Sequence, residues 1–226
     1  SERRNSNRDP NRDTHRDAYG DPLRLTWWMQ NGSLYRDAEN TNVPLASTLT
    51  THLMRTAHGE AIARHGDEFT LHYHTWVWND DDGDGTFFWN QARRFEDTRA
   101  DFDRTVADGL LFEGMFPASF RSGWHYMDEA WQDRLDALVP FSLHNDAPHA
   151  HDDREEPIDN LYDWSRAPLN FTPYRPHSDD YQRPGGSGGW NVRSVSLRLV
   201  TEAIVQQAFE AARAGETQVP CFWGHL

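Results

Sequence analysis

The chain has 226 residues, enough for one sizeable domain, and its net charge of −14 disfavours a nucleic-acid backbone as a partner. Aromatic residues make up 13% of the chain, which excludes a disordered protein and suits stacking on sugar faces, although core packing explains the same rings. Cys221 is the only cysteine, so an intrachain disulfide is excluded, and no apolar run is long enough to span a membrane. The compartment and the oligomeric state stay open.

Residues 1–22 are polar and predict an N-terminal arm or loop, followed by one domain over residues 23–226. Strands are expected over residues 23–29, 69–77, 116–120, 139–143 and 218–224, and helices over residues 47–65, 90–111, 128–138 and 193–214. This alternation predicts parallel strands joined by helical crossovers. Residues 145–190 form a long segment of Pro, Gly, Asp and aromatic residues, and such loops in compact domains are usually functional.

The strand expected at residues 69–77 carries two histidines, His72 and His74. Alternate side chains of a strand share a face, so both imidazoles should lie on the same side. Two imidazoles so placed can bind one divalent ion, with zinc preferred, and their ligand nitrogens should then lie about 3–4 Å apart. The same pattern also fits two structural histidines that point apart or are capped by backbone carbonyls.

Four segments, taken in order, resemble motifs of the polysaccharide deacetylase family (carbohydrate esterase family 4). Residues 66–76 resemble the second motif, whose strand ends in the metal-binding histidines, here His72 and His74. Residues 120–124 resemble the third motif, in which Arg121 would orient a catalytic carboxylate. Residues 161–164 are similar to the fourth motif, with Asp163 and Trp164 near the substrate groove, and residues 219–225 are similar to the fifth, which ends in the catalytic His225.

The chain departs from the family pattern in three places. The family spaces its two histidines four residues apart, but Trp76 occupies that position here, and no Pro follows Arg121. The first motif, Thr-Phe-Asp-Asp-Gly, which would supply the general base and the third metal ligand, is absent. We expect it upstream of Leu23 in a longer protein, or else a different site in which His225 is the third ligand.

The resemblance implies a deformed seven-stranded (β/α) barrel, incomplete at its N-terminus, that hydrolyses acetyl groups on a carbohydrate with a divalent metal. The catalytic residues would be His225, Arg121 and Asp163, and the metal ligands His72 and His74. The aromatic residues expected to contact the carbohydrate are Trp76, Trp124, Trp164, Tyr181 and Trp190.

Other interpretations stay open for the fold and for single residues. The domain can equally be a catalytically silent carbohydrate-binding barrel, or a glycoside hydrolase that uses Asp128 and Asp163 as acid and base. His225 can be a packed strand-end histidine, and Arg121 an ordinary ion-pair partner of either carboxylate.

A second cation signal is independent of the histidines. Residues 80–85 match the start of a calcium loop, with Asp80, Asp82 and Asp84 at ligand positions one, three and five and a Gly at six. Position twelve is Gln91 instead of the bidentate Glu, which lowers the expected affinity. A solvated acidic turn fits the same residues. Likewise, His144, His149 and His151 fit either a metal cluster or an exposed loop.

Overall fold

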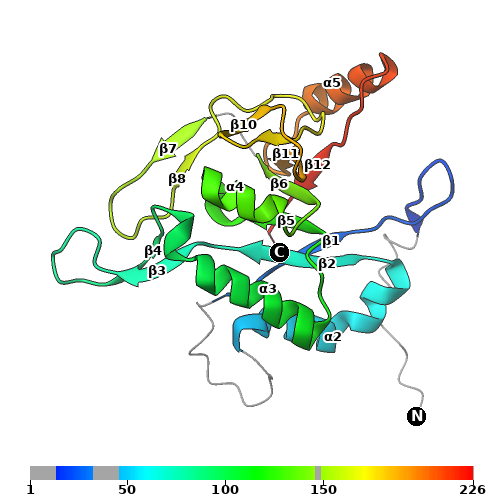
Figure 1. Cartoon of the computed structure of the whole chain (residues 1–226). Coiled ribbons are helices and arrows are strands. Elements are labelled where there is room, and N and C mark those ends of the chain that lie inside the picture. The colour runs from blue at the N-terminus through cyan, green and yellow to red at the C-terminus, as the bar shows by residue number, and fades with distance from the viewer. Residues whose placement is uncertain (1–13, 33–45, 146–148, 226) are drawn as a thin grey trace, which may run out of the picture.

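The computed structural model describes residues 14–32, 46–145 and 149–225, which are arranged around a six-stranded sheet (Figure 1). In spatial order its strands are β1 (Thr26–Gln30), β2 (Glu68–Tyr73), β5 (Ser119–Ser122), β6 (Phe141–Asn145), β11 (Trp190–Ser196) and β12 (Cys221–Trp223). Every neighbouring pair is parallel. The predicted parallel arrangement is therefore confirmed.

The predicted seven-stranded barrel is wrong. The sheet curls into an open half-barrel, in which β1 and β12 are the two edges and each pairs with a single strand. Alternating strands and helices specify parallel pairing, but closure also requires a strand number and a stagger that bring the two edges together. With six strands the edges remain separate, and a pocket described below lies between them.

The strand predicted over residues 69–77 is two strands. β2 ends at Tyr73, and after His74 and Thr75 the chain enters β3 (Trp76–Asn79), which pairs antiparallel with β4 (Phe88–Gln91). This hairpin projects from the end of the sheet (Figure 1). The helix predicted over residues 90–111 is shorter for the same reason: β4 takes its start, a short 3-10 turn η3 (Phe95–Asp97) follows, and α3 covers Arg99–Glu113.

The helix predicted over residues 193–214 is also wrong in its first part. Those residues complete β11, and α5 (Glu202–Arg213) begins only after Thr201, whose side-chain oxygen accepts a hydrogen bond from the Ile204 N–H. β11 is buried on both faces, as central parallel strands are, and therefore shows no clean alternation. Leu197 fitted the helical spacing that continues through Val200 and Ile204, but it lies before the helix and is exposed.

The segment 145–190 contains two small antiparallel pairs instead of one continuous loop. They are β7 (Ala150–Asp152) with β8 (Leu161–Asp163), and β9 (Pro176–His177) with β10 (Asp180–Pro184). The remaining helical elements are η2 (Ala46–Thr48), α2 (Leu49–His65), η4 (Gly123–His125) and α4 (Glu129–Asp136). None of the helices described is both long and apolar enough to cross a bilayer.

The main core lies on the sheet face that α3 and α4 cover. Leu71 and Tyr73 of β2 point into it and meet Phe102 of α3 and Trp131 of α4, and all four side chains are fully buried. Because β2 alternates, the residue between them, His72, points to the opposite face. Burial of large rings on one side of β2 thus fixes the direction in which His72 points.

Candidate functional site

The two predicted imidazoles converge. The Nε2 atoms of His72 and His74 are 3.0 Å apart, and the two rings meet edge to face with centroids 4.8 Å apart. His74 lies just after β2, where its ring stacks on Trp76 at 4.3 Å and meets the edge of Trp124 at 4.7 Å. The geometric expectation of a nitrogen separation of about 3–4 Å is confirmed, since the ligand nitrogens of a tetrahedral zinc ion are about 3.4 Å apart.

Hydrogen bonding fixes the tautomer of His72. Its Nδ1 lies 2.8 Å from the Arg121 carbonyl oxygen, which can only accept, so Nδ1 carries the proton and Nε2 has the lone pair. A carbonyl on the second ring nitrogen is the usual partner of a metal-binding histidine. The Nδ1 of His74 is buried and has no hydrogen-bond partner among the described residues. His74 can therefore donate from Nε2 to His72, or hold its proton at Nδ1 and offer a second lone pair.

Both imidazoles are neutral at physiological pH. Burial, supported by the positive charge of Arg121, lowers the pKa of His72 to about 3. Burial, and next to it repulsion from the neighbouring basic side chains, lowers the pKa of His74 well below its usual value. The neutral form is the one that binds a metal, so the site does not have to lose protons before binding.

Arg121 is the positive charge beside the pair. The β2–β5 register places it next to His72, and it is buried. Its Nη1 donates to the Leu143 carbonyl at 3.3 Å, and its guanidinium lies 3.9 Å from the centre of the Trp223 ring. Asp128, a proposed ion-pair partner, uses its carboxylate elsewhere: it accepts from the N–H groups of Trp131 and Phe95 and from the Tyr126 hydroxyl.

A pocket of about 510 Å³ opens between the two edge strands and reaches these groups. The aromatic side chains that line it from the two edges are Trp27, Trp28, Phe222 and Trp223, and the polar side chains are His72, Arg121 and His225. The His225 ring is 5.3 Å from the Trp223 ring. The pocket therefore joins one predicted metal ligand to the predicted catalytic histidine.

The turn after β5 has little signature in the amino-acid sequence. Trp124 and His125 have φ angles of 46° and 60°, which non-glycine residues rarely adopt and which often accompany functional sites. Gly123 precedes them, and a Cβ at that position would lie 2.2 Å from Cγ of His74. The His125 ring lies 5.9 Å from that of Trp223. The only local signal was the small residue between Ser122 and Trp124.

The aromatic residues predicted to contact the carbohydrate separate into three groups. Trp76 and Trp124 contact His74, as described. Trp164 and Tyr181 are buried in the core, where Trp164 Nε1 donates to the His125 carbonyl and the Tyr181 hydroxyl donates to the Asp163 carbonyl. Trp190 is 40% exposed and lies under the Arg175 guanidinium.

Asp163 is held by local hydrogen bonds. Its carboxylate accepts from the Ser165 N–H at 2.9 Å. Burial acts to raise the pKa of Asp163, but hydrogen bonds from Ser165 and Gln182 and the charge of Arg166 lower it overall. A carboxyl group with a lowered pKa is a poor general acid at neutral pH.

The acidic loop gathers carboxylates as predicted and adds one from a distant segment. Ligand oxygens of Asp80, Asp82, Asp84 and Glu156 lie within 4.8 Å of one another, so this cluster could hold a metal ion. Glu156 comes from the β7–β8 connection, where its Oε1 accepts from the Asp81 N–H and from Asn90, while Oε2 is buried and has no partner among the described residues. Gln91 is not a ligand, because its side chain pairs with the backbone of Leu161.

No other such group of three or more His, Cys, Asp or Glu donors occurs in the described ranges. His72 and His74 thus provide two metal donors, without a third from those residue types within the same reach. In the His-rich segment, His149 pairs with the Tyr162 hydroxyl and His151 with the Asn160 carbonyl. The side chain of His144 lies outside the described residues.

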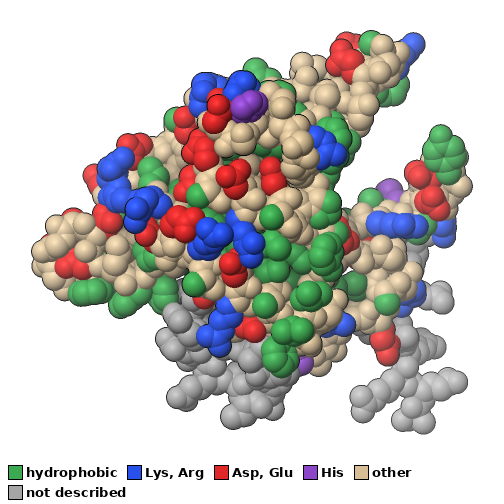
Figure 2. Space-filling model, in the orientation of Figure 1, with side chains coloured by type: hydrophobic (Ala, Val, Ile, Leu, Met, Phe, Trp, Pro, Cys, Tyr) green, Lys and Arg blue, Asp and Glu red, His purple; other side chains and the backbone are tan. Residues whose placement is uncertain are grey.

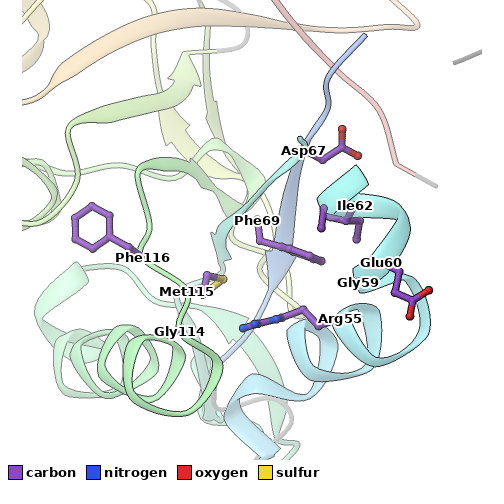
Figure 3. A pocket seen from close by; sticks show the side chains of 10 residues that line it. Arg55, Gly59, Glu60, Ile62, Asp67, Phe69, Gly114, Met115 and Phe116 are labelled. Atoms are coloured by element: carbon purple, nitrogen blue, oxygen red, sulfur yellow. The ribbon is translucent and has the colours of Figure 1, made fainter. Parts of the chain in front are cut away.

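A second pocket, of about 650 Å³, lies at the opposite end of the strands between α2 and the segment before β5 (Figure 3). Phe69 and Met115 contribute to its wall, whereas Phe116 points away from the other labelled side chains. Asp67 lines it too, but its two carboxylate oxygens accept from the Leu25 N–H and the Trp27 indole. Its other charged lining residues are Arg55 and Glu60, and no imidazole lines it, in contrast to the pocket at His72.

No protein-family model, curated protein or solved structure matched this chain.

Proposed function

We propose that this protein hydrolyses an acyl group, most readily acetyl, on a carbohydrate, with a zinc ion held by His72 and His74. The observation that carries the proposal is the 3.0 Å separation of the Nε2 atoms of His72 and His74. Because Nδ1 of His72 donates its proton to the Arg121 carbonyl, Nε2 of His72 presents a lone pair to the site. A zinc ion supplies a Lewis acid for the acyl oxygen and lowers the pKa of bound water. His225 lines the same pocket but is not within ligand reach of the pair, so it would have to move toward the ion to become a third ligand.

The neighbouring side chains support acyl transfer. The Arg121 guanidinium is fixed by the Leu143 carbonyl and the Trp223 ring, so its charge is in place to stabilise the negative charge that develops on the acyl oxygen. If His225 is not a ligand, its exposed ring can donate a proton to the departing sugar oxygen or nitrogen.

The walls of the pocket favour a carbohydrate over a charged substrate. Trp28 and Trp223, whose side chains share the sheet face of His72, offer flat apolar rings on which the C–H faces of a pyranose can stack. The net charge of −14 opposes the approach of polyanions. The glycoside hydrolase alternative is less well supported, because Asp128 already accepts three hydrogen bonds that start α4 and hold its neighbours.

The test is acetate release by metal-stripped protein reloaded with zinc, assayed on acetylxylan and on N-acetylglucosamine oligomers. We expect zinc-dependent release from one of these ester or amide substrates. If neither releases acetate with zinc, cobalt or manganese, although the protein binds the glycan, the silent carbohydrate-binding barrel replaces the proposal. Release of reducing sugar without acetate would favour a glycoside hydrolase.

For the acidic cluster we propose calcium as the ion. Its donors are all carboxylate oxygens, which calcium prefers, and Glu156 supplies the fourth carboxylate that Gln91 does not. The Oε2 atom of Glu156 is buried and has no hydrogen-bond partner among the described residues, which supports the proposal that this carboxylate binds a cation.

Calcium at millimolar concentration should raise the melting temperature by about 5 °C, because the ion binds only the folded loop. The Asp82→Ala variant should lose this rise, and Glu156→Gln should lose most of it. Asp133→Ala, an exposed change on α4, is the control and should keep the full rise. Differential scanning calorimetry with calcium and with magnesium checks this. An equal rise in Asp82→Ala, or no rise in the wild type, would contradict it.

A further inference from the structure

The β3–β4 hairpin carries a row of exposed rings. Trp78 and Trp89 face each other across the two strands, with ring centroids 5.5 Å apart, and Phe87 lies 6.3 Å from Trp78. Trp78 is 56% exposed and Phe87 is 53% exposed. Hydrophobic side chains line the lower edge of the projecting hairpin in Figure 2. Adjacent exposed rings of this size on a projecting element mark an interaction site.

The row continues to the imidazole pair. Trp76 and Trp78 are two residues apart on β3 and therefore share a face, and Trp89 pairs with Trp78 on that face. Trp76 in turn stacks on His74 at 4.3 Å. We call these four residues, Trp76, Trp78, Trp89 and Phe87, the aromatic track. It leads from the candidate metal ligands to the tip of the hairpin.

We propose that the aromatic track binds a glycan chain that extends from the site, so that the substrate is a polysaccharide rather than a short sugar. This inference rests on the proposed function, which places the reacting sugar unit at His72 and His74. The binding of the rest of the chain is inferred from the rings of the hairpin alone. All four members of the track are flat rings, and none is aliphatic. The ring planes are tilted by 54° between Trp78 and Trp89 and by 32° between Trp78 and Phe87, so each ring can contact a different sugar unit of a chain.

Charge and size argue against other occupants. Asp80, Asp82 and Asp84 lie in the loop that connects the two strands, so an anionic membrane surface would be repelled. A fully buried aromatic side chain covers about 150–250 Å², and these rings are only partly exposed. The track is therefore smaller than the roughly 800 Å² that each partner of a stable protein complex buries.

The test is affinity electrophoresis in native gels that contain acetylxylan or glycol chitin. Both polymers are uncharged, which matters because a protein of charge −14 would bind a cationic glycan unspecifically. The variants are Trp78→Ala with Phe87→Ala, and Trp78→Phe as the conservative change. Phe209→Ala on α5 is the matched control, since Phe209 is 55% exposed but far from the hairpin in sequence and on a separate element.

We expect one of the polymers to retard the wild type and Phe209→Ala equally. The double variant should bind about tenfold more weakly, and Trp78→Phe should recover most of the binding because it keeps a ring. Retardation needs no hydrolysis, so this result stands or fails separately from acetate release. No retardation of the wild type by either polymer, or equal retardation of the double variant, would overturn the proposal. The proposal would also be overturned if the wild type sedimented with phosphatidylcholine vesicles and the double variant did not, because the track would then bind membranes.

Discussion

Replacing His72 with Ala should abolish stoichiometric zinc binding, and with it zinc-dependent acetate release. His72 is the imidazole whose lone pair is fixed toward the site, since its Nδ1 proton is donated to the Arg121 carbonyl. Without it, His74 alone provides a donor at this position. We expect the affinity for zinc to fall by more than about a hundredfold, measured by isothermal titration calorimetry.

The control is His58→Ala, which removes an exposed histidine of α2 and should leave zinc affinity unchanged. The pH dependence gives a second check. Because burial lowers the pKa of His72 to about 3, protons should not compete with zinc at this residue between about pH 7.5 and about pH 5. An exposed histidine pair would lose affinity across that range as the pH falls through its ordinary pKa. Wild-type affinity in His72→Ala would show that zinc binds elsewhere.

Replacing Gly123 with Ala should displace the His74 ring, although the change adds only one methyl group. The added Cβ would lie 2.2 Å from Cγ of His74 and 2.5 Å from its Nδ1, far inside van der Waals contact. The ring has little room to move, since Trp76 stacks on it and Trp124 meets its edge. We expect a loss of about 1–3 kcal/mol of unfolding free energy, together with a large loss of zinc affinity.

Gly59→Ala is the matched control, because nothing lies within 4 Å of a Cβ placed at this position of α2. It should raise the unfolding free energy by about 0.5–1 kcal/mol, since Ala is a better helix former than Gly. Chemical denaturation and zinc titration of both variants measure the difference. If Gly123→Ala binds zinc like the wild type, the position assigned to His74 is incorrect.

The strand period predicted the central geometry of the site and little of its surroundings. Large apolar side chains alternate at Leu71 and Tyr73, so burial of one face of β2 forces His72 to the other face. That inference needs only local information. The chain leaves β2 at Tyr73, however, and His74 reaches its place through stacking with Trp76 and Trp124, which a period of two does not describe.

Contacts between distant segments were beyond a pattern-based prediction. Glu156 joins Asp80, Asp82 and Asp84 from the β7–β8 connection, because Asn90 and the Asp81 backbone hold its carboxylate there. The prediction of a closed barrel was wrong for the same reason, since no local pattern specifies whether β1 and β12 pair with each other. Ring composition alone did not separate the buried Trp164 from the exposed Trp78.

The most direct test of the metal site is anomalous diffraction from zinc-soaked crystals, collected on both sides of the zinc absorption edge. We predict one strong peak between His72 and His74, about 2.0–2.1 Å from the Nε2 atom of each. A zinc peak only at the carboxylates of Asp80, Asp82, Asp84 and Glu156, or an unbroken His72–His74 hydrogen bond with no peak beside it, would contradict it.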